Sequence, residues 1–224
     1  MHVEPGIVHG AKMALSFATA AGAGTYALKL AFDGLKDKGI ASLASRTLLA
    51  MASTFTFFQV LPHFPVGVSE VHFILGSTLF LIFGVAPAAF GLALGLLLQG
   101  MLFAPTDLPM YFVNVTTLLV PLFVVSALAK KIIAPNTAYV ELTYKQALKL
   151  STAYQAGIVS WVAFWVLYGQ GFGAEVLASV GSFGLAYMMV ILIEPIADLA
   201  ILKLAKTARG LEVSGLVNQR VYQA

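Results

Sequence analysis

Four histidines are the side chains in this sequence best suited to chemistry: His2, His9, His63 and His72. All four fall within the first third of the chain, and the sequence contains no cysteine. Imidazole is the commonest metal ligand in proteins and suits Zn, Cu, Fe and Ni. If the four lie on one face of the molecule, they indicate a site for a borderline transition metal. For any one histidine taken alone, an ordinary polar residue at a helix end is the more frequent outcome, and we keep that interpretation for His9 and His63.

His2 has a further chemical possibility because it follows the first residue. The amine of Met1, the deprotonated backbone nitrogen of His2 and Nδ1 of its ring would offer three nitrogens in one plane. A fourth nitrogen from His72 or His63 would complete a square-planar set. That geometry suits Ni(II) or Cu(II) better than Zn, which prefers tetrahedral sites.

The elements that position these residues are membrane helices. The sequence has 224 residues, of which 59% are hydrophobic and 10% charged, whereas about 25% are charged in a typical soluble domain. Mean hydropathy is +0.89. The composition predicts an all-α integral membrane protein and excludes a soluble enzyme or a nucleic-acid-binding protein. Apolar stretches predict spans at 11–32, 41–62, 113–133, 147–168 and 177–202.

A sixth apolar stretch, 71–104, is too long for one span. Its roughly 34 residues would form a helix of about 51 Å, against a bilayer core of about 30 Å. Gly84 and Pro87 lie in its middle, and proline breaks a helix because it lacks the backbone donor. We therefore expect two short helices, the third and fourth, joined at Gly84–Pro87, and a bundle of seven helices.

The basic residues predict the orientation of the bundle. With the N-terminus outside and the C-terminus cytoplasmic, every lysine and arginine except Lys12 falls on the cytoplasmic side, as the positive-inside rule requires. The four histidines then share the external side. We expect a single transmembrane metal-binding domain over 1–224, with an external N-terminal segment at 1–10 and a cytoplasmic tail at 207–224.

Several short motifs resemble one family of membrane proteins. The chain begins Met1-His2-Val3-x-x-Gly6 and continues with Pro65-Val66-x-x-Ser69-x-x-His72, Leu75-Gly76, Gln99-x-x-x-Phe103-Ala104, Asn114 and Glu194. This set resembles the CbiM/NikM-type substrate-binding membrane subunits of energy-coupling-factor cobalt/nickel transporters, over most of the chain. Two departures are Tyr187, where family members often carry a histidine, and Glu70, in a loop segment where glycines are common.

The resemblance implies a function and a set of partners. The N-terminal segment would insert into the bundle, and Met1, His2 and His72 would hold divalent cobalt or nickel captured from outside. The chain would not be an enzyme: two cytoplasmic ATPase subunits would hydrolyse ATP, and a transmembrane coupling subunit, sometimes with a small accessory membrane subunit, would complete the assembly. The implied location is the bacterial inner membrane. The choice between cobalt and nickel stays open.

Other polar residues have two interpretations each. Gln99 and Asn114 would either orient the ligating imidazoles or join helices by hydrogen bonds. Glu70 would either attract cations and orient a ligand or remain a solvated loop acid. We interpret Glu194 and Asp198 as structural acids near the cytoplasmic end, paired with a lysine or satisfying the backbone at Pro195, and keep a proton or metal relay as the alternative.

Competing functions have weaker support. A stand-alone secondary permease for a metal ion or small solute would show internal repeats or paired broken helices, and the break at Gly84 has no counterpart in the other half of the chain. A membrane enzyme would need a motif such as His-Glu-x-x-His or Gly-x-Ser-x-Gly, which the sequence lacks. No Gly-x-x-x-x-Gly-Lys-[Ser/Thr] loop is present either, so any use of ATP requires another chain.

Overall fold

The fold is that of a helical membrane protein, as the composition predicts. The computed structural model describes residues 2–208 and 210–223, and the backbone alone for 36–38. The described residues form the α-helices α1 Met13–Phe55, α2 Gly76–Phe83, α3 Val85–Leu102, α4 Tyr111–Ile132, α5 Tyr144–Gln170, α6 Ala174–Met188, α7 Glu194–Thr207 and α8 Leu211–Ser214. Two short strands, β1 Phe64–Val66 and β2 Ser69–Val71, pair antiparallel. Single turns of other helix types lie at Gly10–Lys12, Thr56–Val60, Pro105–Met110, Tyr139–Glu141, Met189–Leu192 and Gln219–Val221.

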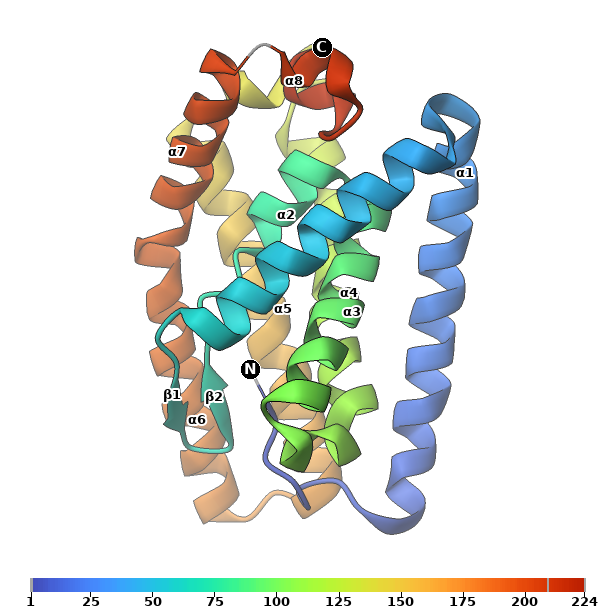
Figure 1. Ribbon diagram of the computed structural model, residues 1–224. Coiled ribbons are helices and arrows are strands. Elements are labelled where there is room, and N and C mark those ends of the chain that lie inside the picture. The colour runs from blue at the N-terminus through green and yellow to red at the C-terminus, as the bar shows by residue number, and fades with distance from the viewer. Residues whose placement is uncertain (1, 209, 224) are drawn as a thin grey trace.

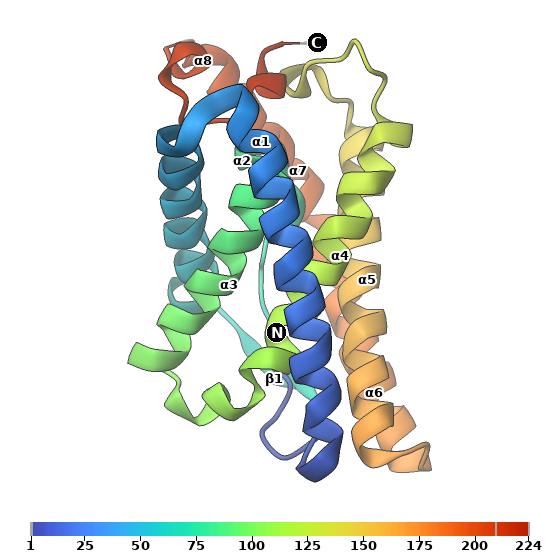
Figure 2. The ribbon, with the colours of Figure 1, turned by 90° about the vertical axis from the view of Figure 1, so that its right-hand side faces the viewer.

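The first two predicted spans are the two arms of α1, which meet at Gly39. Its φ of 72° lies in the left-handed region, which glycine adopts without the steric cost other residues meet. In Figure 1 the chain reverses sharply there, and the second arm crosses the bundle diagonally. Figure 2 shows the first arm running beside α4. The second arm packs closely on α3, where a Cβ at Gly91 or Gly95 would clash with Ala50 or Thr54.

The predicted break in 71–104 is confirmed at Gly84. The residue has φ 86° and separates α2 from α3, and Pro87 lies in the first turn of α3, where its missing N–H leaves no helix bond unmade. The guanidinium of Arg46 donates a hydrogen bond to the backbone carbonyl of Phe83 at 2.9 Å. It thereby satisfies one of the carbonyls left free where α2 ends. At eight residues, or about 12 Å, α2 is too short to cross a bilayer alone.

Five helical segments of the described chain are long and apolar enough to cross a membrane: Gly39–Val60, Val85–Leu102, Pro105–Ile132, Tyr144–Gln170 and Ala174–Thr207. The last joins α6 and α7 through the turn at Met189–Leu192, so the predicted final span is segmented rather than a single helix. Large apolar side chains face outward along these elements, among them Leu185, Leu192 and Leu204. The chain is thus a multi-pass membrane protein, and the count of seven spans and their orientation stay predictions.

The β-hairpin and the N-terminal segment fill the space that the short α2 leaves. The hairpin lies against α6, where a Cβ on Gly67 would clash with the backbone of Ser179. Val3 forms an isolated antiparallel bridge with Ser69, so the N-terminal segment lies beside β2. Figure 1 shows the N-terminus inside the bundle, close to β2, and the C-terminus at the opposite end.

Candidate metal centre

The N-terminal segment is fixed by hydrogen bonds on both sides of His2. The Val3 backbone N–H donates to Asn114 Oδ1 at 2.9 Å, and the Ser69 hydroxyl donates to the backbone carbonyl of His2 at 2.9 Å. The backbone N–H of Glu4 donates to the Val68 carbonyl at 3.3 Å. Because Val3, Ser69 and Asn114 are all buried, these bonds form out of water, and they hold the imidazole of His2 inside the bundle.

His72 reaches the same place from the other direction. It follows β2 and precedes α2, and the chain between them turns at Leu75, whose φ of 52° is left-handed. His2 and His72 are 3% and 1% exposed, and their rings meet edge to face with centroids 5.0 Å apart. Phe58 covers both rings, with centroid distances of 5.4 and 4.9 Å. The two imidazoles therefore lie together in one buried site, covered by Phe58.

Glu70 lies between the two rings. Its Oε2 accepts hydrogen bonds from His2 Nδ1 and from His72 Nε2, each at 2.9 Å. These two bonds lower the pKa of the Glu70 carboxyl below its usual range. Burial lowers the pKa of the His72 ring to about 2 and that of the His2 ring in the same direction. The two imidazoles are therefore neutral at physiological pH, as metal binding requires.

The remaining ring nitrogens, His2 Nε2 and His72 Nδ1, are buried and have no hydrogen-bond partner within the described residues. His2 Nδ1 and His72 Nε2 therefore carry the ring protons and donate them to Glu70. Taken together, His2, Glu70 and His72 each offer one ligand atom, and all of these atoms lie within 4.8 Å of one another. Two imidazoles and a carboxylate form a donor set able to hold a divalent transition metal.

The other predicted metal ligands are placed differently. Met1 lies outside the described residues. His63 is exposed and stacks on His72, with ring centroids 4.7 Å apart and an interplanar angle of 13°, but it does not belong to the cluster of ligand atoms. His9, for which we expected an ordinary polar residue, is exposed before the turn at Gly10–Lys12.

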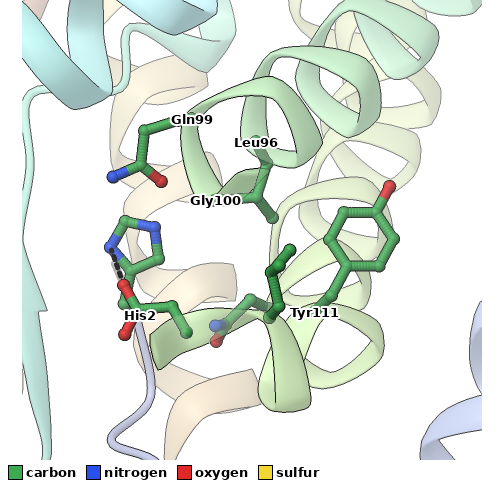
Figure 3. A pocket seen from close by; sticks show the side chains of 8 residues that line it. His2, Leu96, Gln99, Gly100 and Tyr111 are labelled. Carbon is green, nitrogen blue, oxygen red and sulfur yellow. Dashed lines mark ion pairs between the residues drawn. The ribbon is translucent and has the colours of Figure 1, made fainter. Parts of the chain in front are cut away.

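A small cavity adjoins His2 on the side of α3 and α4 (Figure 3). Its volume of about 10 Å³ is room for the centre of about one water molecule. The Gln99 amide points toward the His2 ring, and its Oε1 is buried without a partner in the described chain. Asn114, in contrast, binds the backbone one residue beyond His2. The lining residues are His2, Leu96, Gln99, Gly100, Asp107, Leu108, Tyr111 and Asn114.

Sequence reasoning did not single out Asp107 or Phe58. Asp107 Oδ2 lies 3.9 Å from His2 Nδ1 and adds a second acid beside the histidine pair. A signal was present, because Asp107 is the sole acidic residue between Glu70 and Glu141. Phe58 had no such signal among the many phenylalanines of the chain.

The interpretation of Glu194 and Asp198 as lysine-paired acids is wrong. Both carboxyls are fully buried, and their hydrogen-bond partners are hydroxyl and amide side chains of α2 and α5. No ion pair to a basic residue forms at either acid within the described residues. Uncharged side chains donate hydrogen bonds to these acids instead.

Comparison with known proteins identifies one family. The family model described as the cobalt uptake substrate-specific transmembrane region, CbiM, matches residues 2–210 of the 224. No curated protein and no solved structure matches the chain. The match extends over His2, the β-hairpin, His72 and the buried acids of α7.

Proposed function

Since the chain belongs to the CbiM family of cobalt-uptake substrate-specific transmembrane regions, we propose that it captures divalent cobalt or nickel. Capture would take place on the external side of the membrane, in a seven-span bundle with the N-terminus outside. The single observation that carries the proposal is the convergence of two buried ring nitrogens, His2 Nδ1 and His72 Nε2, on one point, the Oε2 atom of Glu70.

The two ring nitrogens already have the arrangement that a metal ion would use. In the structure, Glu70 Oε2 lies at the point where the two nitrogens meet. For a divalent ion to bind there, each ring would shift its proton to its other nitrogen, His2 Nε2 or His72 Nδ1, which has no partner within the described residues. With Met1 as the first residue, its amine and the backbone nitrogen of His2 would complete a planar set of four nitrogens. In support, the backbone nitrogen of His2 makes no hydrogen bond within the described residues.

Glu70 supplies a carboxylate that stabilises the empty site and competes with the metal. The two hydrogen bonds that it accepts involve a charged acceptor, for which about 1.5–3 kcal/mol each is typical. Metal entry breaks both, at a cost of about 3–6 kcal/mol. Only an ion with strong affinity for imidazole nitrogen offsets that cost, which favours Co²⁺ and Ni²⁺ over Mg²⁺ and Ca²⁺ because the latter prefer oxygen ligands.

Transport would require other chains, because the sequence has no nucleotide-binding loop. The proposed partners are two cytoplasmic ATPase subunits, a transmembrane coupling subunit and, in some assemblies, a small accessory membrane subunit. The chain itself would be the substrate-specificity subunit of this energy-coupling-factor transporter. A stand-alone permease would instead take up metal in cells that lack the ATPases, so uptake with and without them separates the two functions.

The experiment that tests metal capture is titration of the purified protein in detergent with Co²⁺ and Ni²⁺, followed by calorimetry and optical absorption. The native chain is compared with a variant carrying one added residue before Met1, and with a control carrying one added residue after Ala224. We expect tight binding by the native chain and the control, and loss of high affinity in the N-terminally extended variant. Normal binding by the extended variant would exclude the amine chelate. No binding by any form would exclude metal capture.

A further inference from the structure

Glu194 and Asp198 form a second cluster of chemically active groups, away from the histidine site. They lie one turn apart at the start of α7, and both are 0% exposed. The buried titratable side chains on the packed elements are Tyr154 of α5, Tyr187 of α6 and Tyr139 of the turn before α5, and none of these is cationic. The other charged side chains of these elements and of α7 are exposed, among them Lys145, Lys149, Lys203, Lys206 and Glu141. Two ionised carboxylates buried side by side without a cation would be strongly unfavourable, because each loses its hydration and they repel one another.

The polar partners of the two acids are unequal. Glu194 Oε2 accepts hydrogen bonds from Gln155 Nε2 at 2.6 Å and from the Ser151 hydroxyl at 2.5 Å. Asp198 Oδ1 accepts one from the Thr78 hydroxyl. Glu194 is therefore the better stabilised of the two as an anion, since hydrogen bonds to a carboxylate favour its charged form.

The remaining oxygens of the two carboxyls meet at a single hydroxyl. Ser77 Oγ lies 3.0 Å from Glu194 Oε1 and 2.9 Å from Asp198 Oδ2. A serine hydroxyl has one proton to donate, so it satisfies one of these contacts. The other contact is a hydrogen bond only if the carboxyl is the donor, which requires that carboxyl to be protonated.

We propose that Glu194 and Asp198 form a buried proton-binding site, in which Asp198 carries one proton and Ser77 links the two acids. The Asp198 carboxyl donates from Oδ2 to Ser77 Oγ, and the Ser77 hydroxyl donates to Glu194 Oε1. This assignment gives each of these contacts one donor and one acceptor. It leaves a single negative charge on Glu194, where the Gln155 and Ser151 donors are.

Further polar atoms around the pair point to proton exchange. Gln155 Oε1, on the amide that binds Glu194, is buried and has no hydrogen-bond partner in the described chain. The hydroxyls of Tyr154 on α5 and Tyr187 on α6 are likewise buried and unpartnered there. Buried polar groups are normally satisfied, so the unsatisfied oxygen on the Gln155 amide leaves an acceptor for a proton donor next to Glu194.

The proton site also ties two elements of the bundle together. Ser77 and Thr78 belong to the first turn of α2, so the acids of α7 hold that turn in place. His72 lies five residues before Ser77 in the same chain segment. Given the proposed function, loss of the proton would put two like charges at this joint and release the start of α2. The segment that presents His72 would then be free to move.

Infrared spectroscopy of the metal-free protein in detergent tests the proton directly and does not depend on metal capture. At pH 7 we expect the C=O stretch of a protonated carboxyl, which shifts in D₂O and is lost in Asp198→Asn. Asp33→Asn, which removes an exposed acid of α1, is the matched control and should keep the band. Absence of the band in the native protein, or its persistence in Asp198→Asn, would overturn the proposal.

Thermal unfolding of two isosteric variants provides an independent test. The variant Asp198→Asn mimics a protonated aspartate, because its amide donates toward Ser77 and its oxygen accepts from Thr78. Its unfolding midpoint should therefore stay close to the native value. Glu194→Gln removes the charged acceptor and should lower the midpoint by about 5 °C or more. Equal decreases of the unfolding midpoint in the two variants would contradict the assignment of the proton to Asp198. A midpoint that rises with Na⁺, together with no carboxyl band, would replace the proton by a bound cation and also overturn the proposal.

Discussion

Asn114→Leu is expected to weaken metal binding without contacting the metal. In the structure Asn114 Oδ1 accepts the hydrogen bond of the Val3 N–H at 2.9 Å, with both residues buried. Leucine has a similar volume and no acceptor, so the Val3 N–H would be buried without a partner whenever the N-terminal segment is docked. The cost falls on the docked state alone, because in the undocked state water binds that N–H.

The size of the effect follows from that unsatisfied donor. A buried N–H left without a partner costs about 1–3 kcal/mol. If docking of the segment is required to bring His2 to His72, the Kd for Co²⁺ or Ni²⁺ should rise about 5- to 150-fold, at tenfold per 1.4 kcal/mol. Asn114→Ala should cost less than Asn114→Leu. The small cavity beside Asn114 would widen, and a water would then reach the N–H.

Calorimetric titration of the detergent-purified variants measures this change. Thr117→Val is the matched control, because it removes a buried hydroxyl of the same helix whose hydrogen bond goes to the Val113 carbonyl and not to the N-terminal segment. Ser69→Ala, which removes the bond to the His2 carbonyl, should raise Kd about fivefold, as loss of a bond of about 1 kcal/mol predicts. A folded Asn114→Leu protein with a Kd within about twofold of the native value would refute the reasoning, because docking would then not limit binding.

Two further predictions concern the histidines. His72→Ala should abolish high-affinity metal binding. His63→Ala should change Kd by less than about tenfold, because His63 stacks beside the cluster without joining it. Equal losses of metal affinity in the two variants, measured by calorimetry, would make His63 a ligand. The metal-free protein should also lose stability as pH falls below about 6.5. The unfolded His72 ring takes up a proton there, whereas the folded ring, with its pKa lowered to about 2, does not. This ring should lower the free energy of unfolding by about 1.4 kcal/mol for each pH unit. Denaturant unfolding at pH 6 and pH 5 should therefore show a pH dependence that is smaller by that amount in His72→Asn. Glu70 adds to the loss only below its unfolded pKa of 4.5, so an unchanged slope in His72→Asn would contradict the buried neutral ring.

Much of the fold is predictable because its signals are local. Apolar length identifies the membrane helices, and Gly84 marks the reversal between α2 and α3 because its φ of 86° is costly for other residues. The β-hairpin has no comparable signal. Its strands have three residues each, and their pairing depends on Val3 and on Ser179 of α6, which lie far away in the sequence. An isolated two-stranded hairpin is marginally stable in water, so tertiary contacts determine it.

The histidine site was predictable in type and only partly in detail. A histidine at position 2 and another near position 70 are chemically conspicuous, whereas the role of Glu70 depends on geometry. Residues i and i+2 of an extended segment lie on the same face, so Glu70 of β2 and His72, which directly follows β2, point the same way. The sequence does not show that His2 meets them there. That requires the N-terminal segment to pair with β2 through Val3 and Ser69.

The buried acids show why sequence reasoning chose the wrong partner. An acid in an apolar span suggests a lysine, because opposite charge is the most direct compensation for burial. The chain instead compensates Glu194 and Asp198 with Ser77, Thr78, Ser151 and Gln155. Small hydroxyl residues are common in membrane helices and also serve in packing, so their presence carries no signal on its own. The start of α2 is where that difference has its largest consequence. A lysine would give a permanent ion pair, whereas hydroxyl donors and a proton on Asp198 would give a joint that opens when the proton is lost.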